Sequence, residues 1–207
     1  HSKGVKMLTV RVEVGDLPRV HALEAAGYQL MDTLVYFGRS LDDLPQTRPL
    51  IEGVTLRRAG PEDAIAVGEV ACAAFAEYMG HYHADPRLDS DAADAAYVEW
   101  AESSARSASD VAPVMLAERG GQVAGFLTMR RNSPDEFEIV LNAVHPESQG
   151  CGLYAALVAS SLITSWEAGV ASVISSTQIN NYAVQRVWSR LGFCHYRSFY
   201  TFHKWFE

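Results

Sequence analysis

The chain has 207 residues with a formal net charge of −8, and 48% of its residues are hydrophobic against 20% charged. This composition is that of a folded globular protein; it excludes the disordered class and disfavours a general nucleic-acid or anionic-membrane surface. No apolar run reaches the roughly 18 residues that a membrane-spanning helix needs. The cysteines, Cys72, Cys151 and Cys194, are widely spaced and odd in number. A reducing compartment is therefore favoured, and we expect a cytoplasmic protein.

The N-terminal segment has the pattern of a strand, a helix and a second strand. Met7 to Val14 alternates apolar and polar residues, as a half-buried strand does, and Gln29 to Phe37 is the second strand. An early proline and a final glycine bound the short helix between them. Prolines within Leu41 to Pro49 mark a linker. We therefore expect residues 1–48 to form an N-terminal extension and residues 49–207 to form the main domain.

The main domain opens with a short strand and two helices. The strand covers Val54 to Arg58, a helix begins at Pro61 and runs to about Tyr78, and a second helix begins at Ala92. Three strands follow, separated by turn residues, so we expect them to pair antiparallel. Their ranges are Val114 to Glu118, Gln122 to Arg130 and Phe137 to Val144.

A glycine-containing turn follows the third of these strands. Pro146 stops the strand, and Gly150 and Gly152 allow a tight turn before an apolar helix that starts at Leu153. Backbone N–H groups at such a turn point at one spot, and the helix start adds partial positive charge. The turn therefore predicts a site for a phosphate or pyrophosphate group.

The remainder of the chain alternates strands and helices. Val170 to Ser176 is a short strand, and its connection through the apolar helix predicts that it lies parallel to the strand before the turn. A last helix, Asn181 to Leu191, carries apolar residues at helical spacing and ends at Gly192. The aromatic tail from Phe193 to Phe206 is a final strand.

The order of elements over Val54 to Phe206 resembles the GCN5-related N-acetyltransferase (GNAT) family. The family's pyrophosphate signature is Gln or Arg, two residues, Gly, one residue, then Gly or Ala; it is similar to Gln149-Gly150-Cys151-Gly152-Leu153-Tyr154, although Tyr takes the last position. Asn181, followed by Trp188 and by Leu191-Gly192-Phe193, is similar to the family's second motif. The resemblance implies an α/β (α+β) fold of the GNAT type. We expect a mixed, mostly antiparallel sheet with a central parallel β-α-β crossover, preceded by the small strand-helix-strand unit.

The resemblance also implies an enzyme that transfers an acetyl group from acetyl-CoA, its co-substrate, directly to the amine of a small molecule. It assigns cofactor binding to the end of the third strand, to the glycine turn and to one asparagine. These residues are Asn142, Ala143, Val144, Gln149, Gly150, Cys151, Gly152, Leu153, Tyr154 and Asn181. The strand end would pair with the pantetheine arm, and the turn would hold the pyrophosphate.

Two residues are candidates for acid–base catalysis. The spacing of Glu138 from the glycine turn is similar to that of a catalytic Glu in some family members, so we expect it as the general base; the alternative is an exposed strand residue. Many members place Tyr where Trp188 stands, and an indole N–H is not a practical proton donor. Tyr182 is the expected general acid, with Tyr196, a water molecule or unassisted departure of the thiolate as alternatives.

The loop between the two helices of the main domain is rich in groups that can meet an acceptor. Its candidate acceptor-binding residues are Tyr78, His81, His83 and Asp85. Asp85 can receive a cationic amine, and the alternative is a solvated loop. The spacing of the two histidines and Asp85 also occurs in zinc hydrolases, so a metal-dependent hydrolase is a rival hypothesis. Since Pro86 stands where that motif requires a further His, we expect no metal.

The N-terminal unit narrows the expected acceptor. It resembles the partial N-terminal domain of sugar amine acetyltransferases of the dTDP-fucosamine type, which favours an amino sugar or a sugar nucleotide, with another metabolite amine as the alternative. Because Trp188 replaces the usual acid, a degenerate acyl-CoA-binding module without turnover is the non-enzyme alternative. We expect a small-molecule partner, no nucleic acid and no membrane, and either a monomer or a homodimer.

Overall fold

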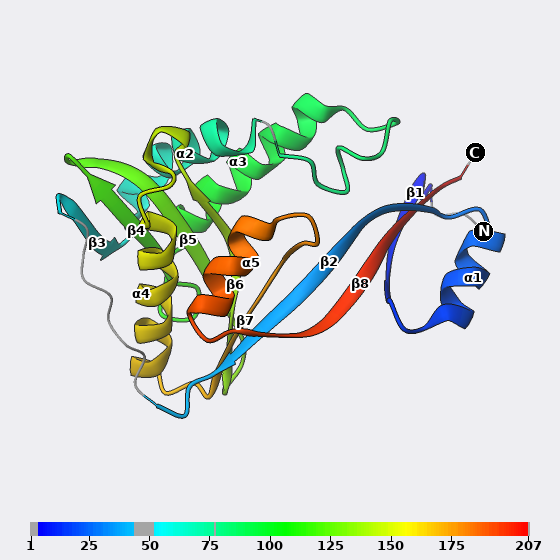
Figure 1. The fold of residues 1–207 in the computed structure, drawn as a ribbon. Coiled ribbons are helices and arrows are strands. Elements are labelled where there is room, and N and C mark those ends of the chain that lie inside the picture. The colour runs from blue at the N-terminus through cyan, green and yellow to red at the C-terminus, as the bar shows by residue number, and fades with distance from the viewer. Residues whose placement is uncertain (1–3, 44–51, 77, 207) are drawn as a thin grey trace.

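The computed structural model describes residues 4–43, 52–76 and 78–206. In this part of the chain, eight strands form one sheet in the order β1-β8-β2-β7-β6-β5-β4-β3 (Figure 1). The strands are β1 (Met7–Glu13), β2 (Gln29–Ser40), β3 (Val54–Arg58), β4 (Val114–Arg119), β5 (Gln122–Ser133), β6 (Glu136–Val144), β7 (Ser172–Gln178) and β8 (Cys194–Trp205). Neighbouring strands pair antiparallel except β6 and β7, which are parallel. The expected mixed sheet with a parallel crossover is confirmed.

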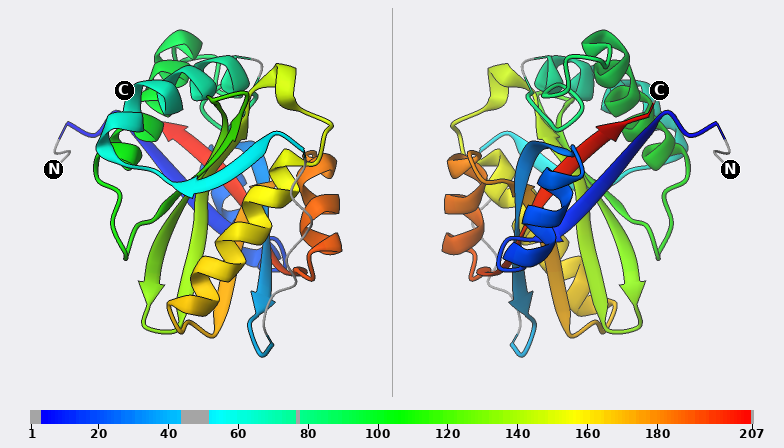
Figure 2. Two further views of the ribbon diagram at one scale, coloured as in Figure 1. Left: turned by 90° about the vertical axis from the view of Figure 1, so that its left-hand side faces the viewer. Right: turned by 90° about the vertical axis from the view of Figure 1, so that its right-hand side faces the viewer.

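Helices cover both faces of this sheet, as Figure 2 shows. They are α1 (Leu17–Ala25), α2 (Ala64–Phe75), α3 (Ser90–Arg106), α4 (Leu153–Glu167) and α5 (Tyr182–Arg190). The apolar sides of α4 and α5 form one core cluster with β2, β5, β6 and β7. The apolar sides of α2 and α3 form a second cluster with alternate residues of β4, β5 and β6. This alternation follows from the two-residue period of a strand, which sends successive side chains to opposite faces.

The helix expected from Pro61 to Tyr78 is shorter than its sequence pattern indicates. A 3₁₀ turn covers Pro61–Asp63, and α2 ends at Phe75. The Gly60 N–H donates to the Asp63 carboxylate at 2.8 Å, and Arg57 binds the same carboxylate at 2.7 Å. These bonds fix Asp63 at the junction between the turn and α2.

The N-terminal strands belong to the same sheet as the rest of the chain. β8 lies between β1 and β2 and pairs with both, while β2 also pairs with β7. Val12, Val20 and Phe202 form a small cluster beneath α1, which lies at the β1 end of the sheet in Figure 1. The expected linker, Leu41 to Pro49, and the boundary at residue 48 fall mostly within residues 44–51, outside the described residues.

A glycine on β5 determines how closely α4 approaches the sheet. A Cβ atom on Gly125 would lie 2.8 Å from Leu153 Cδ2 and 3.1 Å from the Ala143 carbonyl oxygen. Because any larger residue would collide at this point, Gly125 allows the start of α4 to lie directly over β5 and β6. Among the described helices, none is long and apolar enough to cross a membrane.

Candidate active site

The parallel strands β6 and β7 separate partway along their length. They pair from Glu136 and Ser172 as far as Ile139 and Ser175, while β6 continues to Val144. The Ser175 hydroxyl donates to the Ile139 carbonyl oxygen at 3.0 Å, which secures the last paired position. Beyond it β6 and β7 no longer pair with each other and leave a gap in the sheet, while β6 stays paired with β5 and β7 with β2.

A β-bulge explains why β6 turns away from β7. The partner of Leu127 is Asn142 and that of Met129 is Ile139, so β6 holds one residue more than β5 in this interval. An extra residue bends the strand that carries it. The Thr128 hydroxyl accepts the Leu141 N–H at 3.0 Å, so this buried amide keeps a hydrogen bond where the ladder is broken.

A cavity of about 1040 Å³ occupies the gap and continues past the glycine turn and the α2–α3 loop. The ends of β6 and β7 line its middle, with Asn142, Ala143 and Val144 on one side and Ser176 and Thr177 on the other. The glycine turn, the first turn of α4 and Asn181 line one end. The other end is lined by residues of β1, β2, α2, α3 and the α2–α3 loop. The cavity therefore joins the expected cofactor end to the expected acceptor end.

The glycine turn presents unpaired amides, as its sequence predicts. Gly150 and Gly152 have φ values of 76° and 88°, a left-handed backbone that favours glycine. The Gln149 amide donates to the Val144 carbonyl oxygen at 3.1 Å, which closes the turn against the end of β6. In the described part of the chain, the N–H groups from Gly150 to Ala155 have no protein acceptor. Together with the start of α4, they form an anion-binding cradle.

Cys151 is the exception among the residues expected to bind the cofactor. Its thiol donates to the Ser148 carbonyl oxygen at 3.0 Å and packs against the core, and it is not among the residues lining the cavity. The other expected cofactor residues do line it. Asn181 also caps α5: its side-chain oxygen accepts the Val184 N–H at 3.3 Å, and its amide donates to Thr177 at 3.1 Å.

The two departures from the family motifs contact each other. Trp188, on α5, is fully buried, and its indole N–H donates to the Tyr154 hydroxyl on α4 at 3.0 Å. Burial raises the pKa of Tyr154 above its usual value, with the bond from Trp188 opposing this effect. Tyr154 is therefore a neutral phenol at pH 7, and both residues line the cavity. Trp188 thus packs in the core and also makes this hydrogen bond, which sequence reasoning missed.

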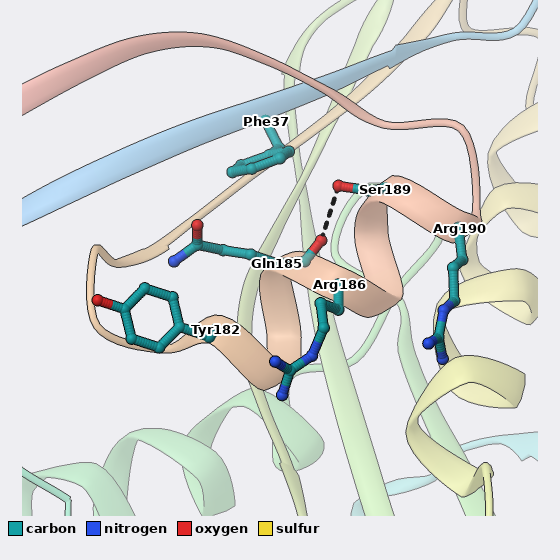
Figure 3. A pocket seen from close by; sticks show the side chains of 6 residues that line it. All are labelled: Phe37, Tyr182, Gln185, Arg186, Ser189 and Arg190. Carbon is teal, nitrogen blue, oxygen red and sulfur yellow. Dashed lines mark hydrogen bonds between the residues drawn. The ribbon is translucent and has the colours of Figure 1, made fainter.

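The structure separates the two expected acid–base residues. Glu138 lines the cavity, where its carboxylate accepts hydrogen bonds from Arg130 at 2.6 Å and Asn132 at 3.1 Å. Tyr182 is 63% exposed and lines a separate pocket on the outer side of α5, shown in Figure 3 with Phe37 and Arg186 among its neighbours. Tyr182 is therefore not brought together with Glu138.

The four expected acceptor residues have different surroundings. Tyr78 and His81 line the cavity. His83 instead binds Asp94 at 2.9 Å and accepts the Gly80 N–H at 3.2 Å. Asp85 is only 3% exposed and lies behind the cavity wall, with hydrogen bonds from His203, Trp205 and Arg87.

Within the described residues, no group of three or more His, Cys, Asp or Glu side chains has an arrangement that would hold a metal ion. His81 and His83, the histidines of the candidate zinc spacing, have different partners, His203 and Asp94. The hydrolase hypothesis therefore has no support from the geometry.

Two charged cavity residues come from the N-terminal strands, where sequence reasoning placed no site residue. Arg11 on β1 and Asp32 on β2 both stand opposite Thr201 of β8, one on each side. Residues directly opposite one another in a sheet share a face, so the pairing directs both charged side chains into the cavity. The alternation of polar and apolar residues along β8 was the signal that could have indicated a polar face there. Thr201 and His203 share that face, while Phe202 packs on the other.

Comparisons with known proteins agree with this geometry. The acetyltransferase (GNAT) family model matches residues 73–193, which include both motifs and the cavity's centre. The chain belongs to the GNAT family. The predicted family and fold class are confirmed, and the predicted enzyme class agrees with the family.

Similar proteins include two kinds of bacterial relative. This GNAT chain is 26% identical to the spore coat polysaccharide biosynthesis protein SpsD of Bacillus subtilis, over 95% of its own length and 65% of the relative's. It is 32% identical to the mycothiol acetyltransferase of Mycolicibacterium paratuberculosis, over 88% of its own length and 60% of the relative's. The chain thus spans about 60 to 65% of these curated relatives.

Solved structures agree on the fold. A GCN5-related N-acetyltransferase from Sphaerobacter thermophilus has a TM-score of 0.73 at 18% identity, covering 97% of this chain and 60% of that one. A putative acetyltransferase from Salmonella typhimurium, with a TM-score of 0.51 and 20% identity, covers 75% of this chain and 95% of that one. Its structure contains acetyl-CoA, the co-substrate that the GNAT family uses.

Proposed function

We propose that this GNAT protein transfers the acetyl group of acetyl-CoA directly to the amine of a small molecule, an amino sugar or a sugar nucleotide. The observation that carries the proposal is the single cavity, with an amide cradle at one end and charged and aromatic side chains at the other. A direct transfer requires both substrates in one enclosure, because the amine must reach the acetyl carbon without a covalent enzyme intermediate.

The cofactor end fits acetyl-CoA. The free N–H groups of Gly150 to Ala155 suit the pyrophosphate. The end of β6 that no longer pairs with β7, including Asn142 and Ala143, suits the amide-bearing pantetheine arm. When bound, acetyl-CoA supplies an acetyl group activated as a thioester. We propose that the ten residues assigned to cofactor binding from the sequence bind acetyl-CoA, with Cys151 contributing through its backbone.

The acceptor end fits a sugar that carries an amine. Tyr97 stacks on Phe75 at a centroid distance of 5.1 Å and on Trp100 at 6.4 Å. Such aromatic faces suit the apolar face of a sugar ring, and Asp32 and Arg11 offer one charge of each sign. Among the relatives, SpsD is named for polysaccharide biosynthesis. These features support an acceptor with a cationic amine and an anionic or hydroxyl-rich remainder.

The leaving thiol requires a proton, and two tyrosines are candidates. Tyr182 stays a prediction, since it lies outside the cavity lining. Tyr154 is a second candidate. Because its oxygen already accepts the Trp188 N–H, its own hydroxyl proton is free to be donated within the cavity. Comparing Tyr154→Phe with Tyr182→Phe tests the choice. Only the variant that removes the true proton donor should lower kcat substantially, because the CoA sulfur then leaves as an unprotonated thiolate.

We propose further that residues 1–48 are an extension without which residues 49–207 have an incomplete acceptor site. The support is the position of β2 between β7 and β8 and the presence of Arg11 and Asp32 in the cavity. A chain that lacks residues 1–48 should lose both stability and activity. Unchanged stability and turnover would show that the extension is dispensable.

A thiol-release screen tests the proposed function. The protein is incubated with acetyl-CoA and a panel of amino sugars, sugar nucleotides, polyamines, amino acids and aminoglycosides, and released CoA is measured, with acetyl-CoA binding followed by calorimetry. We expect release with an amino sugar or a sugar nucleotide. Binding without release across the panel would favour the acyl-CoA-binding module that the replacement of the usual tyrosine by Trp188 suggests, and absence of binding would refute the proposal.

A further inference from the structure

A chain of hydrogen bonds runs from the acceptor end of the cavity into the protein interior. His81 Nδ1 lies 3.0 Å from His203 Nε2, and His203 Nδ1 lies 2.8 Å from Asp85 Oδ2. His203 and Asp85 are 1% and 3% exposed. The carboxylate also accepts the Trp205 indole N–H at 2.9 Å and the Arg87 backbone N–H at 3.0 Å. The chain therefore begins at a cavity residue and ends at a fully bonded, buried carboxylate.

The carboxylate determines where the protons of both histidines lie. Burial alone would raise the pKa of Asp85, but the bonds from His203, Trp205 and Arg87 outweigh it and hold the pKa below its usual value. An ionised Asp85 only accepts, so His203 donates from Nδ1, and in its neutral form it accepts at Nε2. His81 then donates from Nδ1. Its Nε2 is left with a lone pair, and in the described part of the chain the only side-chain hydrogen bond of His81 is the one from Nδ1.

An unpaired carboxylate lies near this histidine. Asp32 Oδ1 is buried without a hydrogen-bond partner among the described residues, and Oδ2 has only the Gln178 side-chain amide at 3.5 Å. Both Asp32 and His81 line the cavity, and the negative charge of Asp32 acts on His81. A buried carboxylate oxygen without a donor is costly, so it marks a position where a ligand supplies the donor.

We propose that Asp32 holds the ammonium group of the acceptor, that His81 is the catalytic base that removes its proton, and that His203 and Asp85 are positioning residues for His81. This inference rests on the proposed acetyl transfer and identifies the residues that act on the amine. In this proposal the α2–α3 loop and the N-terminal strands, which are distant in the sequence, together bind and deprotonate the acceptor amine.

The proposed transfer begins with the ammonium form of the acceptor. One N–H bond of the ammonium breaks, and its proton forms a bond to His81 Nε2. The freed nitrogen lone pair attacks the acetyl carbonyl carbon of acetyl-CoA, and the carbon–sulfur bond breaks with its electron pair on sulfur. The attacking nitrogen loses a second proton, and the thiolate takes one up. The products are the amide, CoA as a thiol and one proton released to solvent when His81 returns to its neutral form.

The surroundings of His81 keep its ring neutral, so that the Nε2 lone pair carries no proton. Burial lowers the pKa of His81 to about 4, opposed by Asp32 and assisted by His203, Arg11 and His83. His81 is thus neutral at pH 7. The Tyr82 ring packs against the His81 ring at a centroid distance of 3.9 Å. Once His81 is protonated, its charge can be shared with His203 beside the ionised Asp85.

Glu138 is the competing base, and its contacts differ. Its carboxylate already accepts Arg130 and Asn132, and a proton taken up there would weaken the ion pair with Arg130. Kinetics of His81→Asn and Glu138→Gln therefore separate the two assignments. We expect kcat/KM to fall about 100- to 10,000-fold in His81→Asn, the usual contribution of a general base, and much less in Glu138→Gln. The reverse order would overturn the proposal.

Two further variants test the other roles. Asp32→Asn should raise KM for the acceptor about 10- to 100-fold, the range of a hydrogen bond to a charged group, and leave KM for acetyl-CoA unchanged. Asp85→Asn should lower kcat at least about tenfold with little change in KM. The variant removes the negative charge that stabilises the protonated form of His81 through His203. The matched control is His195→Asn, an exposed histidine of the same strand as His203 that bonds Ser198 at 2.8 Å; it should retain full activity.

The pH profile distinguishes a base from a structural residue. In His81→Asn, kcat/KM should rise about tenfold per pH unit up to the pKa of the acceptor amine, since the variant uses amine that is already neutral. At that pKa it should approach the rate of the unaltered protein. A deficit that stays constant with pH would assign His81 a structural role only.

Nitrogen-15 NMR of the histidine rings tests the arrangement in the unaltered protein without any substrate. We expect His81 to carry its proton on Nδ1 at pH 7, with Nε2 unprotonated. A proton on Nε2, or a charged ring, would overturn the proposal even if a substituted protein failed to fold. If no amine is acetylated, the proposed function fails while this measurement still decides the hydrogen-bond chain. If acetylation occurs but His81→Asn behaves as the control, only the present inference fails.

Discussion

Replacing Trp188 with Phe tests the hydrogen bond that joins α4 and α5 in the cavity wall. Trp188 is fully buried, donates to Tyr154 at 3.0 Å, and packs against Phe37 and Phe193 at centroid distances of 5.5 and 6.2 Å. Phe keeps an aromatic ring in this cluster but removes the N–H and part of the volume. Leaving the Tyr154 hydroxyl without its donor costs about 1–3 kcal/mol, and the space left by the smaller ring adds about 1 kcal/mol. We expect the free energy of unfolding to fall by about 2–4 kcal/mol.

A double-mutant cycle isolates the contribution of the bond. Tyr154→Phe leaves the buried indole N–H without an acceptor and should cost about 1–3 kcal/mol. The double variant leaves neither group unpaired, so its loss should be smaller than the sum of the single losses by about 1–2 kcal/mol. Urea unfolding followed by circular dichroism measures all four proteins. Single losses that add to within about 0.5 kcal/mol would refute the reasoning, because they would show that the two side chains do not depend on each other.

Three other perturbations test the site and its supports. Thr128→Val removes the acceptor of the Leu141 N–H at the β6 bulge, so urea unfolding should show a loss of about 1–3 kcal/mol; an unchanged stability would contradict the role given to the hydroxyl. Gly150→Ala places a side chain at a φ of 76° at a cost of about 1–2 kcal/mol, and calorimetry should show weaker acetyl-CoA binding, whereas equal affinity would argue against the cradle. Burial, assisted by the charge of Asp32, raises the pKa of Tyr78 from 10.0 to about 12. Because the unfolded chain releases this proton first, stability should be complete below pH 10 and decline as pH rises through 12. Tyr78→Phe should flatten that decline, and an identical decline in the variant would show that other groups cause it.

The cofactor end of the cavity could be predicted from the sequence because its features are local. Gly150 and Gly152 indicate a left-handed turn, and the helix that follows them needs no distant contact to offer its amides. Asn181 similarly caps the helix that begins immediately after it. Signals of this kind depend on backbone conformation within a few residues, so a single sequence displays them.

The acceptor end could not be predicted in the same way, because its geometry depends on strand pairing. Asp85 looked like a substrate ligand, yet its carboxylate faces His203 on the last strand and not the cavity. Asp32 showed no local signal; its position beside the α2–α3 loop follows from the pairing of β2 with β8. The separation of β6 and β7 likewise depends on a bulge opposite Thr128, which no periodicity in β6 indicates.

The sequence by itself determined the family, the order of most elements and the anion cradle, because hydrophobic periodicity, glycine turns and helix caps are encoded over short distances. Only the tertiary structure decided which charged residues meet at the proposed acceptor end of the cavity. It placed β8 between β1 and β2, so that Arg11 and Asp32 face one cavity and His203 reaches His81 from behind the cavity lining. The physical reason is that a sheet joins residues through register, and register between distant strands is a property of the whole fold.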